Sequence, residues 1–196
     1  MRIDELSYRK GTSGDARRCA ALLAEAFETY RAFAPSGWSP PSLDEEAANL
    51  AERLDQPEVW SMLGEHGTTL VGHVAIMPAA LHARAVPDPA LAHFWQLFVA
   101  RPWWGTGLAT RLHARALAEA GARGFASLRL FTPARHARAR RFYEREGWTL
   151  VAPPTFEDRI GFDIVEYRKT LAPERASGRE CDLEPPGRRS RERGAT

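Results

Sequence analysis

The sequence predicts an α/β protein with one mixed central sheet of about six to seven strands and helices on both faces. Two observations lead to this expectation. Segments with apolar residues at helical spacing interrupt shorter segments rich in β-branched and aromatic residues, and glycine or proline separates most of them. The 196 residues include 44% hydrophobic and 27% charged residues, close to the globular average, which excludes a wholly disordered chain and a fibrous repeat.

The first expected elements are a short strand and two helices. Residues 6–9 alternate weakly and are expected to form a strand. Thr12 can cap the helix that follows, and Asp15 three residues later suits the positive end of that helix. Helical spacing of apolar residues then continues over 19–30. A proline-rich loop separates this helix from a second one, expected over 42–55.

The remaining elements begin with strands and then alternate strands with helices. Residues 93–99 form the strongest expected strand, because they are aromatic and nearly all apolar. The helix after this strand ends at Gly121, since glycine tolerates the backbone that closes a helix. The other expected elements are strands over 59–63, 69–76, 127–131, 148–151 and 162–167, and helices over 108–120 and 137–146.

The segment between the 93–99 strand and the next helix contains Gly105 and Gly107. Glycines let backbone N–H groups approach a ligand, and a helix start adds free N–H donors and a positive dipole end. Together they predict an anion site of a kind that suits a pyrophosphate. Alone, the two glycines are weak evidence for an anion site, because a plain turn between a strand and a helix can contain the same residues. No P-loop pattern is present, and Thr110 stands in place of the third glycine of the dinucleotide fingerprint.

A second motif lies downstream, where a short helix containing Tyr143 is followed by Gly147 and Trp148. The two motifs, in this order and at this spacing, resemble the GNAT family of acyl-CoA N-acyltransferases. The expected element order is similar to that family's fold over about residues 6–171. The matching positions are Val99, Gly105, Gly107, Ala109, Ala139, Tyr143, Gly147 and Trp148.

The resemblance implies an N-acetyltransferase that transfers an acetyl group from acetyl-CoA to a primary amine by direct attack, without a metal. The pantetheine arm is expected along the end of the 93–99 strand and the pyrophosphate on the glycine loop. Arg138 and Arg141 are candidates for the 3′-phosphate of coenzyme A. The expected cofactor-binding residues are Phe98, Val99, Trp104, Gly105, Thr106, Gly107, Leu108, Ala109, Thr110, His136 and Arg141.

Two residues depart from the family's pattern. Trp104 stands where Gln or Arg is usual, which removes one side-chain contact with the pyrophosphate and leaves the backbone N–H groups. His136 stands where Asn is usual, and an imidazole can still donate a hydrogen bond.

The resemblance also assigns Tyr143 as the general acid that protonates the departing thiolate; the alternative is a helix tyrosine packed on the sheet. His93 is the candidate base, because it lies six residues before Val99 and an imidazole with a pKa of about 6.5 suits that task. The alternative is a hydrogen-bonded strand histidine, with water chains carrying the proton. His73 is a weaker candidate base.

By the same resemblance, the acceptor amine is expected near the first two helices and the loop between the last two expected strands. These segments carry aromatic residues beside acids, a combination that suits a cationic amine. Alternatively, the acids are there because a helix start stabilises negative charge, and the aromatic residues belong to the core. The residues are Phe27, Glu28, Tyr30, Phe33, Trp38, Asp44, Glu45, Glu46, Phe156, Glu157 and Asp158.

Two other functions stay open: an acyl-CoA-binding module of the same fold without catalysis, and a nucleotide-phosphate protein. The net charge of +2 does not favour nucleic acid, and no apolar run is long enough to span a membrane. We therefore expect a small-molecule or peptide amine as partner and a cytoplasmic location; a homodimer is left open.

Cys19 and Cys181 have no metal or disulfide spacing. Residues 173–196 are expected to be a disordered charged tail after a domain of residues 1–172.

Overall fold

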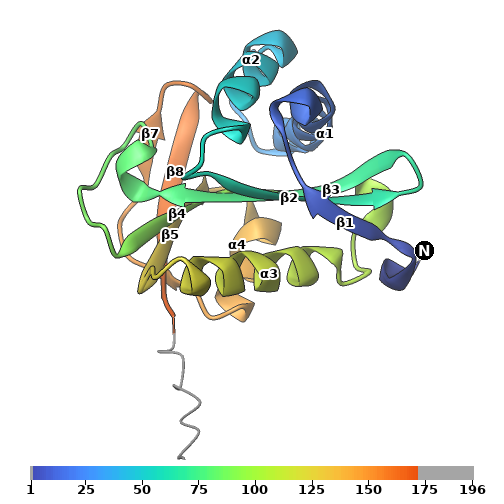
Figure 1. Cartoon of the computed structure of the whole chain (residues 1–196). Coiled ribbons are helices and arrows are strands. Elements are labelled where there is room, and N and C mark those ends of the chain that lie inside the picture. Colours follow the sequence, from blue (N-terminus) through green and yellow to red (C-terminus); the bar gives the residue numbers. More distant parts are fainter. Residues whose placement is uncertain (1, 172–196) are drawn as a thin grey trace, which may run out of the picture.

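The computed structural model describes residues 2–171, so the expected tail, with Cys181, lies outside the described residues. The fold is a mixed eight-stranded sheet with helices on both faces (Figure 1). The strands are β1 (Ser7–Lys10), β2 (Trp60–His66), β3 (Thr69–Pro78), β4 (Leu91–Val99), β5 (Ser127–Pro133), β6 (Thr149–Leu150), β7 (Thr155–Glu157) and β8 (Phe162–Thr170). The helices are α1 (Ala16–Glu28), α2 (Leu43–Leu54), α3 (Leu108–Ala122) and α4 (Ala137–Arg145), with a short 3-10 turn, η3 (Thr29–Ala32), after α1.

The strand order is β1-β2-β3-β4-β5-β8-β6, with β7 paired to β8. The predicted mixed α/β fold is confirmed, and the sheet has one strand more than the six to seven expected. The extra strand is β7, in the segment that we expected to be a loop. Three residues without a clear alternation carry no strand signal, and this strand exists because it pairs with β8 from Thr155–Ile164 to Glu157–Phe162.

Helices α3 and α4 cover one face of the sheet. Leu108, Leu112 and Ala116 of α3 are fully buried in the main core. Gly72 on β3 permits this close packing, because a Cβ there would lie 2.8 Å from the Leu112 side chain. A side chain at Gly72 would therefore force Leu112 and Leu108 of α3 to shift.

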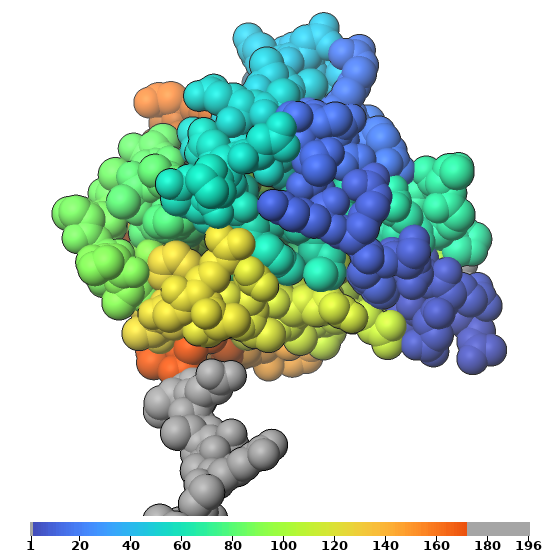
Figure 2. Space-filling model, in the orientation of Figure 1, coloured from blue at the N-terminus to red at the C-terminus, as the bar shows by residue number. Residues whose placement is uncertain are grey.

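Helices α1 and α2 cover the opposite face, and the space-filling view shows their side chains filling the layer above the sheet (Figure 2). Cys19 of α1 is buried in this second core with Leu50, Leu54 and Leu63. Burial raises the pKa of the Cys19 thiol to about 12, so this cysteine is an inert apolar residue at neutral pH. Among the described residues, no helix is long and apolar enough to cross a bilayer.

Strands β4 and β5 part after a short parallel contact. They pair from Leu91–Ser127 to His93–Arg129 only. Beyond this point β5 continues to pair with β8, and β4 continues along β3 until Val99 lies opposite Gly72. The second half of β4 therefore has an edge that β5 does not cover, in the middle of the sheet.

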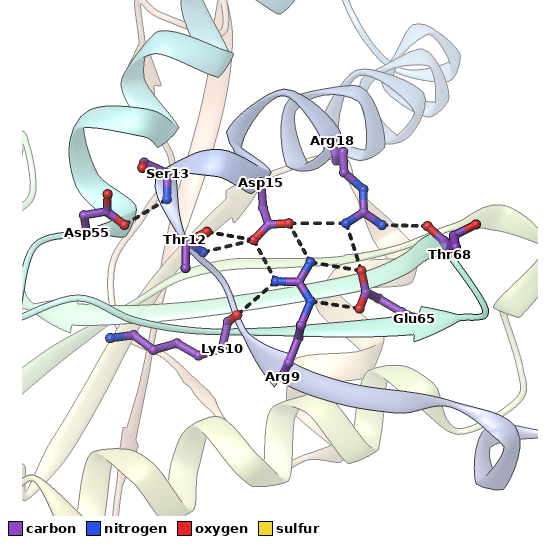
Figure 3. Close-up of polar contacts among 9 residues, drawn as sticks. All are labelled: Arg9, Lys10, Thr12, Ser13, Asp15, Arg18, Asp55, Glu65 and Thr68. Atoms are coloured by element: carbon purple, nitrogen blue, oxygen red, sulfur yellow. Dashed lines mark hydrogen bonds and ion pairs between the residues drawn. The ribbon is translucent and has the colours of Figure 1, made fainter.

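An ion-pair network fastens the first strand to the rest of the fold (Figure 3). Arg9 of β1 donates hydrogen bonds of 2.6 and 2.8 Å to the Asp15 carboxylate and of 2.9 and 3.1 Å to Glu65 of β2. Arg18 of α1 lies 3.2 Å from Asp15 and 2.9 Å from Glu65. Asp15 also accepts bonds from Thr12, whose backbone and side chain complete the expected capping box.

Both carboxylates in this network are held in their charged form. The hydrogen bonds from Arg9 lower the pKa values of Asp15 and Glu65 below the ordinary range for carboxyl groups. Because their folded-state pKa values are depressed, the stability that they contribute is complete above their unfolded pKa values, about 4. It is lost as the pH falls through the folded-state values.

We expect Asp15→Asn to lower the free energy of unfolding at pH 7 by about 2 kcal/mol, since it removes the buried negative charge that pairs with Arg9 and Arg18. The same variant should lose less stability than the wild type between pH 5 and pH 3. Urea unfolding followed by circular dichroism measures both effects. The control is Asp44→Asn, which breaks the exposed Arg17–Asp44 pair and should change stability by less than about 0.5 kcal/mol. Equal losses in the two variants would contradict the prediction.

Candidate functional site

The opening between β4 and β5 is a cavity of about 180 Å³. Its walls come from β4, β5, α4, the start of α3 and the end of α1 with η3. Residues far apart in the sequence, such as Tyr30, Trp104 and Tyr143, therefore line the same cavity. The half-buried state of Leu97, Phe98 and Val99, unusual in the middle of a sheet, results from this opening.

The backbone of β4 presents polar groups to the cavity. The Ala100 N–H donates to the Val71 carbonyl on β3, at 2.9 Å. Because N–H and C=O directions alternate along a strand, the backbone groups of Phe98 also point to β3, while those of Leu97 and Val99 point into the opening. Of the two residues expected to bind through the backbone, Val99 is thus oriented for it and Phe98 lines the cavity with its side chain.

A β-bulge changes the direction of β4 inside the cavity. Ala75 on β3 pairs with Gln96 and Ile76 pairs with Phe94, so Trp95 has no partner on β3. A bulge leaves one residue's backbone groups outside the ladder. Both Trp95 and Gln96 line the cavity as a result.

The glycine loop leads from β4 to α3 with two left-handed residues, as the motif predicted. Gly105 has φ +77° and Gly107 has φ +91°, values that only glycine adopts readily. A Cβ at Gly105 would meet no atom within 4 Å, so the space in front of the loop is open. The first backbone bond into α3 comes from Arg111 to Gly107, which leaves the N–H groups of residues 108–110 without a partner in the described part of the chain.

Two of the expected backbone donors are already used inside the loop. The Trp104 N–H donates to Arg101 at 3.1 Å, and the Thr106 N–H approaches the Trp103 carbonyl at 3.5 Å. The N–H groups available to an anion are therefore those around Gly105, Gly107 and the first turn of α3. They lie at the positive end of a 15-residue helix.

Trp104 and Arg138 meet at the mouth of the cavity. The Trp104 indole Nε1 donates to the Val99 carbonyl at 2.8 Å. The Arg138 guanidinium lies over the same indole, 3.3 Å from the ring centroid. Both residues line the cavity, whereas Arg141, the other candidate for a phosphate, is exposed on α4 outside the lining.

Tyr143 lies in the wall formed by α4, with 9% of its surface exposed. Its ring packs edge-on against Phe94, at 6.4 Å between centroids, and against Trp148, at 5.9 Å. Within residues 2–171 its hydroxyl has no hydrogen-bond partner. Desolvation by burial raises the pKa of Tyr143 above its ordinary value of 10, so the phenol stays protonated at neutral pH.

His136 begins α4 and lines the same cavity. Its Nδ1 is buried without a partner among the described residues. Burial lowers the pKa of His136 to about 4, so the ring is neutral at pH 7. It can therefore accept or donate a hydrogen bond within the cavity.

His93 lies at the closed end of the opening and is not part of the lining. It is 2% exposed, its ring centroid lies 4.0 Å from that of His82, and Phe131 packs on it as well. Burial, with a smaller effect of His82 and Arg129, lowers its pKa well below the ordinary value. The structure thus does not bring His93 and Tyr143 together around the cavity. His73, on β3, is also buried outside the lining, and burial lowers its pKa to about 4.

Sequence reasoning missed the cavity roles of Trp95, Phe131 and Thr132. In the sequence, Trp95 is one more aromatic residue of a strand. The bulge that exposes it to the cavity depends on how β4 pairs with β3. Phe131 and Thr132 face the opening only because β5 parts from β4. No local pattern in the sequence signals either event.

Comparisons with known proteins agree with this architecture. The family model described as the acetyltransferase (GNAT) family matches residues 23–148. A search of curated proteins finds no match. A GNAT-family protein from Desulfovibrio desulfuricans has a similar structure, with a TM-score of 0.66 and 20% identity over 85% of this chain and 99% of its own.

Two further solved structures contain the cofactor or its product. YncA from Salmonella typhimurium, with its cofactor acetyl-CoA, has a TM-score of 0.62 and 15% identity over 90% of this chain and 99% of its own. PaiA N-acetyltransferase from Thermoplasma acidophilum, in complex with coenzyme A, has a TM-score of 0.58 and 14% identity over 85% and 99%. At these identities the structures show a shared fold, while the family model covers more than half of the sequence. The chain belongs to the GNAT family of acetyltransferases.

Proposed function

We propose that the protein is an N-acetyltransferase that moves the acetyl group of acetyl-CoA to a primary amine. One observation carries the proposal: the uncovered edge of β4 is followed, after a short 3-10 turn (Arg101–Trp103), by a glycine loop with open space at Gly105 and a helix start with free N–H groups. A ligand with an amide chain and a pyrophosphate matches both features in this order. The solved relatives with acetyl-CoA or coenzyme A support the same assignment.

The residues of the cavity fit each part of acetyl-CoA. The amide groups of pantetheine can pair with the backbone of Leu97 and Val99, as an added strand would. The pyrophosphate can take the free N–H groups at the start of α3. Trp104 must release the Val99 carbonyl for complete pairing, and Arg138, which lies over the Trp104 indole, is the candidate for a phosphate oxygen.

In the reaction, the amine nitrogen attacks the thioester carbon. The new C–N bond forms, the C–S bond breaks, and the sulfur leaves as a thiolate. Tyr143 donates its phenolic proton toward this sulfur, and its burial keeps that proton in place until the charge develops. The proton that the nitrogen loses passes through water to Tyr143 and replaces the phenolic proton given to the sulfur, so the products are the amide and coenzyme A. Backbone N–H groups of β4 near the Trp95 bulge are the candidate donors for the transient oxyanion.

The glycine loop can be tested with two matched variants. Gly105 and Gly124 have similar positive φ values, +77° and +83°, and at both a Cβ would meet no atom within 4 Å. We expect Gly105→Ala and Gly124→Ala to lose similar stability, about 1 kcal/mol each. Only Gly105→Ala should weaken acetyl-CoA binding, because its methyl group stands in front of the N–H donors.

The measurement is the shift of the melting temperature with acetyl-CoA, compared with ATP and NAD. A saturating ligand at about 100 times its Kd adds about 2.7 kcal/mol of stability. A shift with ATP or NAD and none with acetyl-CoA would support a nucleotide-phosphate protein instead.

Tyr143→Phe tests the acid. We expect kcat to fall by about 10²-fold or more, with unchanged affinity for acetyl-CoA, since only the hydroxyl is lost. Tyr167→Phe is the matched control, because this buried tyrosine outside the cavity lining bonds Arg140 and Glu144 and should affect stability rather than kcat. Unchanged turnover in Tyr143→Phe would remove the acid role.

His93→Gln tests the base that the sequence suggested. We expect the shape of the pH profile of kcat/KM to stay as in the wild type, because His82 and Phe131 enclose the ring away from the cavity. Steady-state kinetics between pH 6 and pH 9 provide the measurement. The disappearance of one ionisation from the profile would instead establish His93 as the base.

A further inference from the structure

One wall of the cavity is built from aromatic rings. Tyr30 of η3, Phe98 of β4, Phe131 of β5 and His136 at the start of α4 all line it. Tyr30 and His136 contact each other edge-on, with centroids 5.1 Å apart. Aromatic residues from η3, β4, β5 and the residue before α4 therefore face the same cavity.

A second layer of aromatic residues supports this wall. Phe33 stacks on His136 at 5.4 Å, and Phe162 packs edge-on against Tyr30 at 5.9 Å. Trp38 packs on Phe162 and donates its indole N–H to the Ile160 carbonyl. Because Tyr30 and His136 are each supported by further rings, this part of the wall is preformed.

No carboxylate takes part in the lining among the described residues. Three of the acids that the sequence placed near the acceptor form ion pairs outside this lining: Glu28 with Arg31, Glu46 with Arg159, and Glu157 with Arg84. Asp44 pairs with Arg17 on the surface. The acids that the sequence proposed for a cationic amine are thus absent from this lining, while Glu28 lies with Glu25 in the lining of a neighbouring cavity that shares Thr29 and Trp104.

The remaining ionisable groups of the lining also disfavour positive charge. Arg138 is the lining residue with a permanent positive charge, and Tyr30, His136 and Tyr143 are neutral at pH 7. An ammonium group that must stay charged has no counterion here, and its burial is strongly unfavourable. The reacting amine has no such difficulty, because desolvation lowers its pKa and yields the neutral nucleophile.

Resting on the function proposed above, we propose that the acceptor is a small primary amine on an aromatic or otherwise flat apolar body, with no second positive charge. The rings of Tyr30, Phe98 and Phe131 contact that body by offset or edge-on stacking. A diamine short enough to place both nitrogens within this lining is disfavoured, since its second ammonium group would be buried without a counterion. The same desolvated wall prepares the amine for attack without a basic side chain in the cavity.

The test compares kcat/KM, with acetyl-CoA as donor, for 2-phenylethylamine, butylamine and 1,4-diaminobutane. We expect 2-phenylethylamine to exceed butylamine by about tenfold, from stacking on the wall. The diamine should fall below butylamine by about tenfold or more, from its second charge. A diamine that matches or exceeds 2-phenylethylamine would overturn the proposal, as would equal values for 2-phenylethylamine and butylamine.

A variant with a new carboxylate makes the test independent of the wild-type rate. Thr29 lines the cavity, so Thr29→Glu should raise the ratio of diamine to 2-phenylethylamine turnover by about tenfold. Thr68→Glu, at the exposed β2–β3 turn, is the control and should leave the ratio unchanged. An unchanged ratio in Thr29→Glu would contradict the charge argument.

Binding gives a readout that does not depend on turnover. Saturation-transfer NMR on the complex with coenzyme A should detect 2-phenylethylamine and not 1,4-diaminobutane. If coenzyme A binds and 2-phenylethylamine does not, the acceptor proposal is wrong while the proposed function stands. If neither acetyl-CoA nor coenzyme A shifts the melting temperature, the proposed function itself fails.

Discussion

The structure depends on the parting of β4 from β5 after the His93–Arg129 pair. Each strand is held on its other side, β4 by β3 and β5 by β8, so neither can move to close the opening. Phe94, Tyr143 and Trp148 pack against one another on the α3–α4 face, and the indole of Trp148 donates to His113 of α3 at 2.8 Å. The result is a rigid opening in the centre of a sheet, with an unpaired strand edge as its wall.

Charge is distributed so that the opening stays apolar. Several carboxylates away from the opening are paired with arginines, as in the network of Arg9, Asp15 and Glu65 and in the exposed Arg17–Asp44 pair. Besides Arg138, the polar groups of the opening are uncharged: backbone N–H donors, the side chains of Gln96 and Thr132, protonated phenols and a neutral imidazole. Such a site favours an anionic group at its mouth and a neutral nucleophile within, as acetyl transfer to an amine requires.

Much of the site was predictable because its parts are local in sequence. The aromatic run of 93–99 marked a buried strand, and the structure places β4 there. Gly105 and Gly107 marked left-handed positions before a helix, and both have positive φ. The position of His93 was not predictable in the same way, since its distance from the cavity depends on where β4 and β5 part.

By itself, the sequence determined the order of strands and helices, the glycine loop and the family to which they belong, because each leaves a pattern within a few neighbouring residues. Only the tertiary structure decided that β7 pairs with β8, that Trp95 forms a bulge, and that Tyr30, Phe131 and His136 form one wall without a carboxylate. These features arise from contacts between residues up to about a hundred positions apart, whose pairing no local periodicity encodes.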